Sequence, residues 1–278
     1  MLSKILESCN YVADNSKEVK INEVKLIEFA KTIKNVNTMH WLSSSPYNLL
    51  DLPVDVIVNF LLIYESIDFS FWGNPKWTID TIYGKEDGSI ALLCALLKFT
   101  KDNNTTDLSN ISKEEFRKIL NGNVEIPLFE KRYHIIKSVS NIVNKKMNRN
   151  FYEFIKNVNN DTDLFNIIIN YFPSFQDVRT YKEKKIYFYK LAQLLTSDIL
   201  HIKQQKENTN SDYSHLVGCS DYKIPQVLRA LGILEYSKDL ENLVDNKKEI
   251  KINSVYEVEI RSNMIVVIDK IKKLLNNK

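Results

Sequence analysis

Apolar residues recur every three to four positions along most of this chain, which is the spacing of an amphipathic α-helix. The pattern predicts helices over 22–34, 52–66, 88–99, 112–120, 127–146, 150–158, 161–171, 183–203, 225–231, 238–245 and 254–275. The period-two alternation of strands is weak, and only Trp77–Tyr83 suggests a short β-hairpin. The pattern therefore predicts an all-α, mainly helical fold.

Start and stop signals support several of these helices. Ser112–Glu115 and Ser254–Glu257 have the spacing of a capping box, in which the serine and glutamate side chains bind each other's backbone N–H groups. Pro127 and Pro225 suit a first helical turn, and Gly232 suits a C-terminal cap. These signals indicate where four of the predicted helices begin or end.

The order of elements also bears on the domain organisation. Pro225–Val244 is predicted as helix, Leu-Gly-Ile turn and helix, similar to the helix-hairpin-helix of base-excision DNA glycosylases but without its second turn glycine. The polar loops Lys101–Asn110 and Lys203–Ser214 are too short to mark a domain boundary, and there are no internal repeats. We expect one α-helical domain over residues 1–278.

Composition agrees with a helical chain and narrows the function. Six glycines and six prolines in 278 residues supply few of the turns that an all-β fold needs. The 38 basic and 35 acidic residues give a net charge of +3, without the excess of positive charge typical of proteins that grip a nucleic-acid backbone. Only six of the basic residues are arginine, and Arg229 and Arg261 are candidates for sites that need a planar, bidentate cation.

Cysteines, histidines and apolar runs exclude several protein classes. Three widely separated cysteines indicate no disulfide framework, and the four histidines lack metal-ligand spacing, so no metal or cofactor is expected. The N-terminal sequence lacks a secretory signal, and the longest apolar stretches are too short to span a bilayer. We expect a cytoplasmic protein with no membrane partner.

Asp221 is the first candidate for chemistry, and two interpretations remain open. It stands four residues before Pro225, where a carboxylate commonly caps a helix. A carboxylate at a helix N-terminus is also favoured in its charged form by the helix dipole, which suits a catalytic role. The two roles are compatible.

Lys190 is the second candidate. On the predicted helix it lies in the row Ile186, Lys190, Leu194, and it shares a face with Gln193. A lysine among apolar rows either extends its ammonium to solvent or is held in a pocket. A pocket would require a nearby carboxylate.

Other polar and aromatic groups have alternatives of the same kind. The segment Ser66–Trp72, with Asp68, Phe69 and Trp72, is either the end of a core helix or a wall on which a planar base stacks. Glu259–Arg261 is either a surface ion pair of small worth or a substrate contact, with Arg261 as the phosphate clamp.

Several of these segments resemble one known family. The residues that carry the resemblance are FPSFxDV and FYKxAQ within Phe172–Gln193, DYxxPQVLxxLGxLxYS within Ser220–Asp239, EVEIR within Tyr256–Arg261, SIDFSFW at Ser66–Trp72, and matching stretches in Trp77–Leu97 and Ile119–Arg132. They occur in unbroken order over roughly residues 55–272. On these motifs the chain resembles the queuosine salvage proteins, the queuosine 5′-phosphate N-glycosylases.

The resemblance implies hydrolysis of queuosine 5′-phosphate to queuine and ribose 5-phosphate, so that the base is recovered for transfer RNA modification. It implies a small-molecule nucleotide substrate and no direct nucleic-acid binding. It also implies Asp221 and Lys190 as a paired catalytic set. The substrate-binding residues that it implies are Asp68, Phe69, Trp72, Gln193, Tyr222, Glu259 and Arg261. In queuosine a carbon replaces N7 of guanine, so this usual protonation site is absent. Either departure of the base is assisted elsewhere on the base, or the carboxylate does more, as nucleophile or as activator of water.

Some positions depart from the family pattern. Asp68 stands where relatives usually have asparagine, Ser89 and Ile90 stand where two aromatics are usual, and the chain ends at Lys278 without the aromatic tail of many members. We expect the pocket wall to differ accordingly.

The alternative functions are a glycosylase acting on DNA bases and a catalytically inactive binding protein of the same fold.

Overall fold

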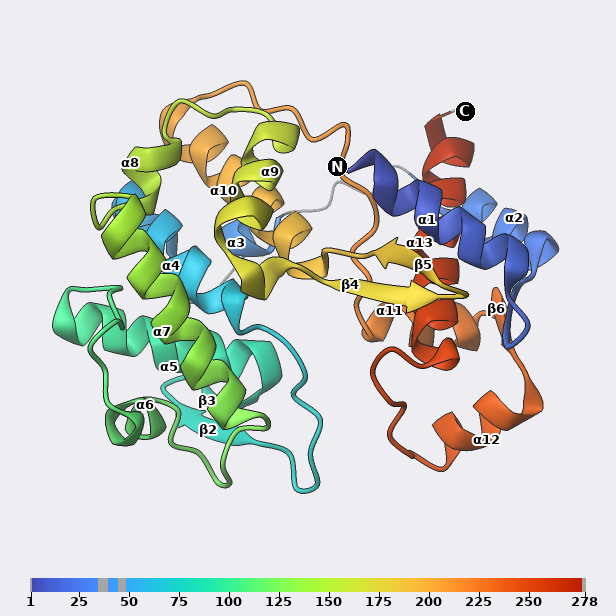
Figure 1. Cartoon of the computed structure of the whole chain (residues 1–278), viewed down its shortest axis with the longest axis horizontal. Coiled ribbons are helices and arrows are strands. Elements are labelled where there is room, and N and C mark those ends of the chain that lie inside the picture. Colours follow the sequence, from blue (N-terminus) through green and yellow to red (C-terminus); the bar gives the residue numbers. More distant parts are fainter. Residues whose placement is uncertain (1, 35–39, 45–48, 277–278) are drawn as a thin grey trace. The chain divides into compact units, whose positions relative to one another are not determined.

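The computed structural model describes residues 2–34, 40–44 and 49–276. The chain forms two compact units, each built from separate stretches of sequence. Unit 1 contains Met1–Thr38, Gln176–Gln193 and Ser214–Lys278, and unit 2 contains Met39–Phe175 and Leu194–Tyr213. Helices dominate both units, with α7 (Phe129–Lys146, green) and α13 (Val255–Asn276, red) among the longest (Figure 1). The mainly helical class is therefore confirmed, while a single domain stays a prediction.

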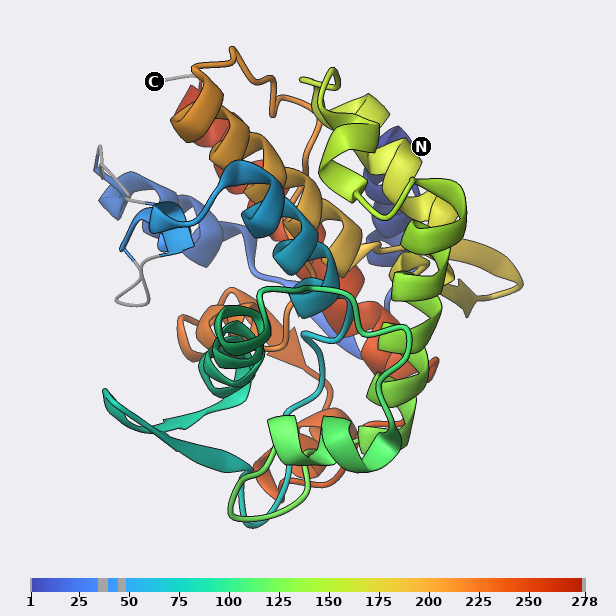
Figure 2. The same ribbon diagram turned by 90° about the vertical axis from the view of Figure 1, so that its left-hand side faces the viewer.

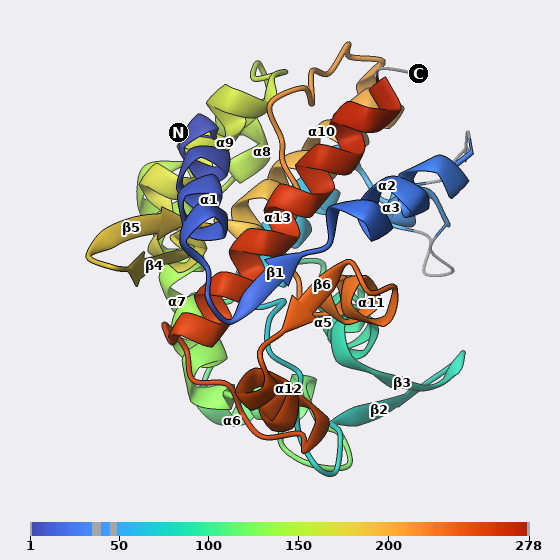
Figure 3. The same ribbon diagram turned by 90° about the vertical axis from the view of Figure 1, so that its right-hand side faces the viewer.

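In unit 1, the long helix α13 forms the centre. Helix α1 (Ser3–Asn15) packs along it (Figure 3) through a stripe of Ile5, Cys9 and Val12, all fully buried. This spacing of four and three places the three side chains on one helical face. The other elements are β1 (Val19–Ile21), α2 (Glu23–Thr32), β4 (Val178–Tyr181), β5 (Lys184–Tyr187), α11 (Lys223–Ala230), β6 (Leu234–Tyr236) and α12 (Lys238–Asp245).

Short antiparallel strand pairs hold distant parts of unit 1 together. Strand β1 pairs with β6, so that Val19 lies opposite Tyr236 and Ile21 opposite Leu234. The turn between α11 and β6 contains Gly232 at a φ of 69°, a left-handed conformation that glycine adopts at little cost. Its predicted role as a helix C-terminal cap is confirmed.

The helix predicted over 183–203 is wrong at its start. Lys184–Tyr187 is strand β5, paired with β4, and α10 (Lys190–Glu207) begins only at Lys190. Lys182 and Glu183 form the hairpin turn with positive φ angles of 45° and 67°. Such a turn usually carries Asn-Gly or Asp-Gly, so the sequence lacked the usual hairpin signal. Ile186 therefore does not share a helical row with Lys190.

Unit 2 is built around α4 (Val54–Ser66), whose residues from Phe60 to Ser66 are all buried. The predicted hairpin near Trp77–Tyr83 is confirmed as β2 (Thr78–Thr81) and β3 (Gly84–Asp87), drawn in teal in Figure 2. The remaining elements are α3 (Trp41–Ser44), the 3₁₀ turns η1 (Leu49–Asp51) and η2 (Pro173–Phe175), α5 (Gly88–Asn103), α6 (Lys113–Ile119), α7, α8 (Phe151–Ile155), α9 (Asp161–Tyr171) and the part of α10 after Gln193.

Capping in unit 2 follows one of the two sequence signals. Pro127 lies before α7 and not in its first turn, because the helix begins at Phe129 with Leu128 at the N-cap position. The Ser112 hydroxyl accepts a hydrogen bond from Glu115 N–H, and the Glu115 carboxylate accepts one from Ser112 N–H, so the capping box of α6 is confirmed. Asn150 and Asn160 cap α8 and α9 with their side-chain oxygens. No helix in the described part of the chain has the length and apolar character needed to cross a membrane.

Candidate active site

Lys190 and Asp221 lie together in unit 1. The Lys190 Nζ and Asp221 Oδ2 atoms are 3.8 Å apart, and the two side chains are 16% and 29% exposed. Lys190 is the first residue of α10, and Asp221 stands in the loop that leads into α11. The structure thus places a cation beside a carboxylate that solvent still reaches.

The two oxygens of the Asp221 carboxylate have different surroundings. Oδ1 accepts a hydrogen bond of 2.7 Å from the backbone N–H of Lys223, the first residue of α11. Oδ2 is the atom that faces Lys190. The cap-like hydrogen bond and the ion pair therefore coexist on one side chain, as the sequence allowed.

The start of α10 is fixed by Asp177. The carbonyl oxygen of Asp177 accepts hydrogen bonds from the N–H groups of Phe188 and Tyr189, at 3.0 and 3.2 Å. Tyr189 has a φ of 48°, an uncommon conformation for a bulky residue, and this turns the chain from β5 into the helix. The Asp177 carboxylate also accepts the backbone N–H of Lys190.

Four charged side chains form a balanced cluster beside this turn, which we call the arginine cluster: Asp177, Arg179, Glu257 and Arg261. Arg261 pairs with both carboxylates, at 3.0 Å from Glu257 and in a two-pronged contact with Asp177. Arg179 also pairs with both, at 3.0 and 3.1 Å. Two guanidiniums thus face two carboxylates.

Burial and charge act in opposite directions on the pKa values of this cluster. Burial alone would raise the pKa of Asp177, but the Arg261 and Arg179 guanidiniums outweigh it and hold that pKa below its ordinary value. Burial alone would lower the pKa of Arg261, but the charges of Asp177 and Glu257 hold it above its ordinary value. Asp177 and Arg261 therefore both stay charged at neutral pH.

Arg261 reaches the residue next to Asp221. Its Nη2 donates a hydrogen bond of 2.8 Å to the Ser220 hydroxyl, and its guanidinium lies over the Phe188 ring at 4.0 Å from the centroid. The sequence predicted Arg261 as a phosphate clamp. In this structure the guanidinium binds Asp177, Glu257 and Ser220. Its role as a phosphate clamp stays a prediction.

Gln193 connects α10 to the segment before Asp221. Its side-chain oxygen accepts the Val217 N–H at 3.0 Å, and its amide nitrogen donates to the Phe188 carbonyl at 3.1 Å. A Cβ on Gly218 would lie 3.0 Å from the Ile268 side chain, so a larger residue would require that side chain of α13 to shift. A substrate contact by Gln193 stays a prediction.

The two remaining sequence candidates of unit 1 differ in exposure. Tyr222, next to Asp221, is 37% exposed. Glu259 is fully buried, and its carboxylate accepts hydrogen bonds from the N–H groups of Lys17, Glu18 and Val19 and from the Tyr181 hydroxyl. The structure gives Glu259 a clear structural role, and its predicted substrate contact is untested.

Asp68, Phe69 and Trp72 lie on one segment of unit 2, after α4. Asp68 is 7% exposed and Trp72 is 62% exposed. Arg132 on α7 holds this segment, because its guanidinium donates to the carbonyl oxygens of Ile67, Phe69 and Ser70. Burial lowers the pKa of Arg132 to about 10, and the Asp68 charge opposes that shift. Arg132 thus holds the backbone of this segment in place.

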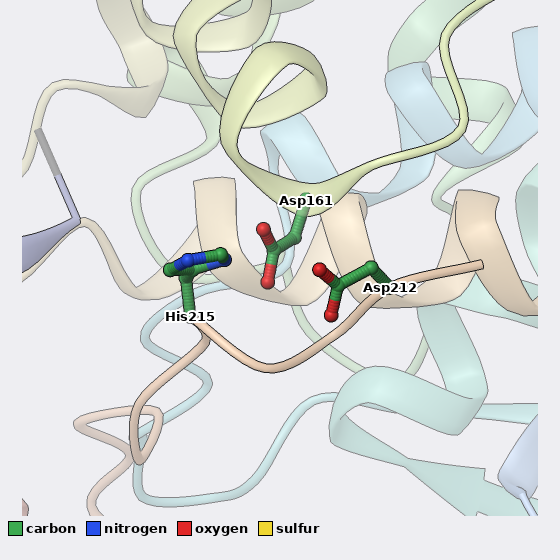
Figure 4. A group of neighbouring side chains, drawn as sticks. All are labelled: Asp161, Asp212 and His215. Carbon is green, nitrogen blue, oxygen red and sulfur yellow. The ribbon is translucent and has the colours of Figure 1, made fainter.

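Asp161 and Asp212 of unit 2 are drawn in Figure 4 together with His215. The Asp161 N–H donates to the Asp212 carbonyl at 3.1 Å, and the Asp161 side chain is buried while that of Asp212 is exposed. His215 belongs to unit 1, and no ligand set is assigned across the units. The expected absence of a metal stays a prediction.

Sequence reasoning missed Arg179 and did not assign a role to Asp177 or Ser220. Asp177 stands in the FPSFxDV motif and Ser220 stands directly before Asp221. These positions in the sequence could have indicated that both residues belong to the site. Arg179 lies in a strand that was not predicted, and it carried no signal.

Comparison with known proteins identifies similar chains. The family described as queuosine salvage protein matches residues 51–278. A protein of Sphaerobacter thermophilus is 31% identical over 227 residues, covering 80% of this chain and 70% of the relative. Proteins of Dictyostelium discoideum and Bos taurus are 26% and 25% identical, covering 99% and 97% of this chain and 88% and 84% of the relatives. All three relatives are named queuosine 5′-phosphate N-glycosylase/hydrolase.

Proposed function

The chain belongs to the queuosine salvage protein family, and from this membership we propose that it hydrolyses the N-glycosidic bond of queuosine 5′-phosphate. Water is consumed, and the products are queuine and ribose 5-phosphate. The observation that carries the proposal beyond family membership is the Lys190–Asp221 pair, at 3.8 Å within unit 1.

Asp221 is the proposed catalytic carboxylate. As the bond to the base breaks, positive charge develops on the ribose, and a nearby negative charge stabilises this oxocarbenium-like state. The Oδ1 atom is held by the Lys223 N–H, so the carboxylate is oriented before the substrate binds. Because the 7-deaza base lacks N7, stabilisation on the sugar side carries more of the reaction.

Lys190 is proposed to supply a positive charge beside the Oδ2 atom of Asp221, at 3.8 Å from its ammonium. Hydrolysis needs no covalent bond to an amine, so Lys190 is not proposed as a nucleophile. An ammonium is also a suitable donor to the hydroxyl or phosphate oxygens of the sugar.

Recognition of the base is proposed for the segment of unit 2 after α4. Trp72 is 62% exposed and is proposed to stack on the base, with Phe69, whose ring also lies beside the Arg132 guanidinium, as a second aromatic contact. The Asp68 carboxylate suits the N–H groups of a base edge or an ammonium of the side arm. Arg132 supports this segment through its backbone carbonyl groups. In unit 1, Gln193, Tyr222, Glu259 and Arg261 stay proposed substrate contacts.

We also propose that α11, β6 and α12 correspond to a helix-hairpin-helix region like that of glycosylases. Support comes from the two short helices, which are joined by a turn with Gly232 in a left-handed conformation and by the three-residue strand β6. A substrate that is a free nucleotide fits the net charge of +3, since a nucleic-acid backbone would favour a larger positive excess.

The test is incubation of the purified chain with queuosine 5′-phosphate and detection of free queuine and ribose 5-phosphate by mass spectrometry. The Sphaerobacter thermophilus relative serves as the positive control. We expect release of queuine from the nucleotide and none from transfer RNA that contains queuosine. No release by this chain under conditions in which the relative is active would reject the proposal.

A further inference from the structure

The distance between the Lys190 and Asp221 side chains must be set by residues other than these two. The two residues are carried by different elements, and an attraction at 3.8 Å between partly exposed charges fixes geometry only weakly. A catalytic carboxylate must stay within a fraction of an ångström of its working position, because small displacements cost much of the rate. Other groups must therefore hold the two elements.

One hydrogen-bonded path runs from the backbone of Lys190 to the residue beside Asp221. The Asp177 carboxylate accepts the Lys190 N–H and pairs with the Arg261 guanidinium. Arg261 in turn donates to the Ser220 hydroxyl at 2.8 Å. Ser220 is nearly buried, so this hydrogen bond is shielded from water.

The arginine is suited to this role by its shape. A guanidinium is planar and presents its N–H donors at fixed angles, so it can bind two carboxylates and a hydroxyl in one rigid arrangement. The guanidinium lies over the Phe188 ring, and the two carboxylates that it binds are also held by Arg179. The Lys190 side of the path is rigid as well, because the Asp177 carbonyl binds the turn before α10.

We propose that Asp177, Arg261 and Ser220 form a positioning path that sets the distance between Lys190 and Asp221. This inference rests on the proposed function, since it presumes that Asp221 and Lys190 act in catalysis. Arg261 is a positioning residue here, in contrast to the phosphate clamp that the sequence suggested.

The most selective test removes one hydroxyl. Ser220→Ala deletes the acceptor of the Arg261 hydrogen bond and leaves Asp221, Lys190 and the arginine cluster in place. We expect kcat for queuosine 5′-phosphate to fall about ten- to a hundredfold. The KM should stay within about twofold because no proposed substrate contact is removed, and the Tm should fall by only about 2–4 °C, the shift expected for the loss of one shielded hydrogen bond.

A double-mutant cycle tests whether Arg261 acts through Ser220. Arg261→Lys keeps a cation but cannot reproduce the planar fork, so kcat should fall to a similar extent. In that background, Ser220→Ala should change kcat by less than about twofold, because the hydrogen bond is already lost. Arg229→Lys, at a second arginine of unit 1 that also pairs with two carboxylates, is the matched control and should keep full activity.

The possible outcomes separate this inference from the proposed function. If Ser220→Ala keeps wild-type kcat while Asp221→Asn is inactive, the positioning path is rejected and the proposed function stands. Effects of Ser220→Ala and Arg261→Lys on kcat that multiply in the double variant would also reject the positioning path. A rise in KM without a fall in kcat for Arg261→Lys would reject it too, and would assign Arg261 to phosphate binding. If Asp221→Asn itself is fully active, the proposed function fails. Should Arg261→Lys not fold, Ser220→Ala alone decides.

Discussion

Lys190 Nζ and Asp221 Oδ2 are 3.8 Å apart, while the second oxygen of Asp221 is occupied by the N–H of the first residue of α11. One carboxylate thus orients a helix start and faces a lysine at the same time. A helix cap needs only an oxygen acceptor, whereas the chemistry proposed for this site needs the negative charge. Substitutions can separate the two requirements.

Removing the Lys190 charge should slow turnover without unfolding the protein. Lys190→Met keeps a long side chain but leaves Asp221 without its ammonium. We expect kcat to fall at least about tenfold, the lower part of the range for loss of a positioned polar group, while the Tm changes little. Steady-state kinetics and thermal unfolding measure both quantities. Lys238→Met, at an exposed lysine on α12, is the control, and equal activity of the two variants would contradict the role of Lys190.

Asp177 should make the stability depend on acidity. Arg261 and Arg179 hold its folded-state pKa below the ordinary value, so its charged form stabilises the fold above the unfolded-state pKa of about 3.9. That contribution is lost as the pH falls through the folded-state pKa. The Tm difference between the wild type and Asp177→Asn should therefore be full near neutral pH and shrink below about pH 4. A difference that stays constant or grows in acid would show that Asp177 is not held by these arginines.

Glu259 should respond as a structural residue. Glu259→Gln places an NH₂ donor where three backbone N–H groups now converge on a carboxylate, leaving buried donors unsatisfied. We expect a loss of about 2–4 kcal/mol in the free energy of unfolding. Tyr181→Phe, which removes a single hydrogen bond to the same carboxylate, should cost about 1 kcal/mol. Unchanged stability together with a raised KM would instead favour the substrate contact that the sequence predicted.

Removal of divalent ions should leave the activity intact. The proposed reaction uses a carboxylate to stabilise charge on the sugar and a lysine to hold that carboxylate, and no step calls for a metal. Exhaustive treatment with EDTA should therefore keep kcat/KM at the value of a sample dialysed without chelator. A loss that zinc or calcium restores would contradict this expectation and direct attention to acidic groups such as Asp161 and Asp212.

The helices were predicted best where apolar spacing and a polar cap coincide. The predicted spans 161–171 and 238–245 match α9 and α12, each preceded by a capping asparagine or serine. Helix α1 was missed although Ile5, Cys9 and Val12 carry the spacing, because its N-cap position has no side-chain acceptor. The pairing of β1 with β6 joins residues far apart in sequence, and three-residue strands leave no local pattern.

The proximity of Lys190 and Asp221 could be predicted from the sequence, but the arginine cluster around them could not. Lys190 and Asp221 were matched through family motifs, and the structure brings them together. The hairpin turn at Lys182 and Glu183 needs left-handed backbone at two ordinary residues, so nothing in the sequence indicated the strand that carries Arg179. Arg261 was recognised as unusual, but its partners come from distant segments, and only the fold shows which anion it binds.

The most direct measurement is the turnover of queuosine 5′-phosphate by Asp221→Asn. Asparagine keeps an oxygen for the Lys223 N–H, so the start of α11 and the Tm should be preserved. It cannot supply the negative charge, so kcat should fall at least about a hundredfold. The variant should still bind the nucleotide, which would raise its Tm. Turnover near the wild-type value would contradict the catalytic role of Asp221 and leave it as a helix cap alone.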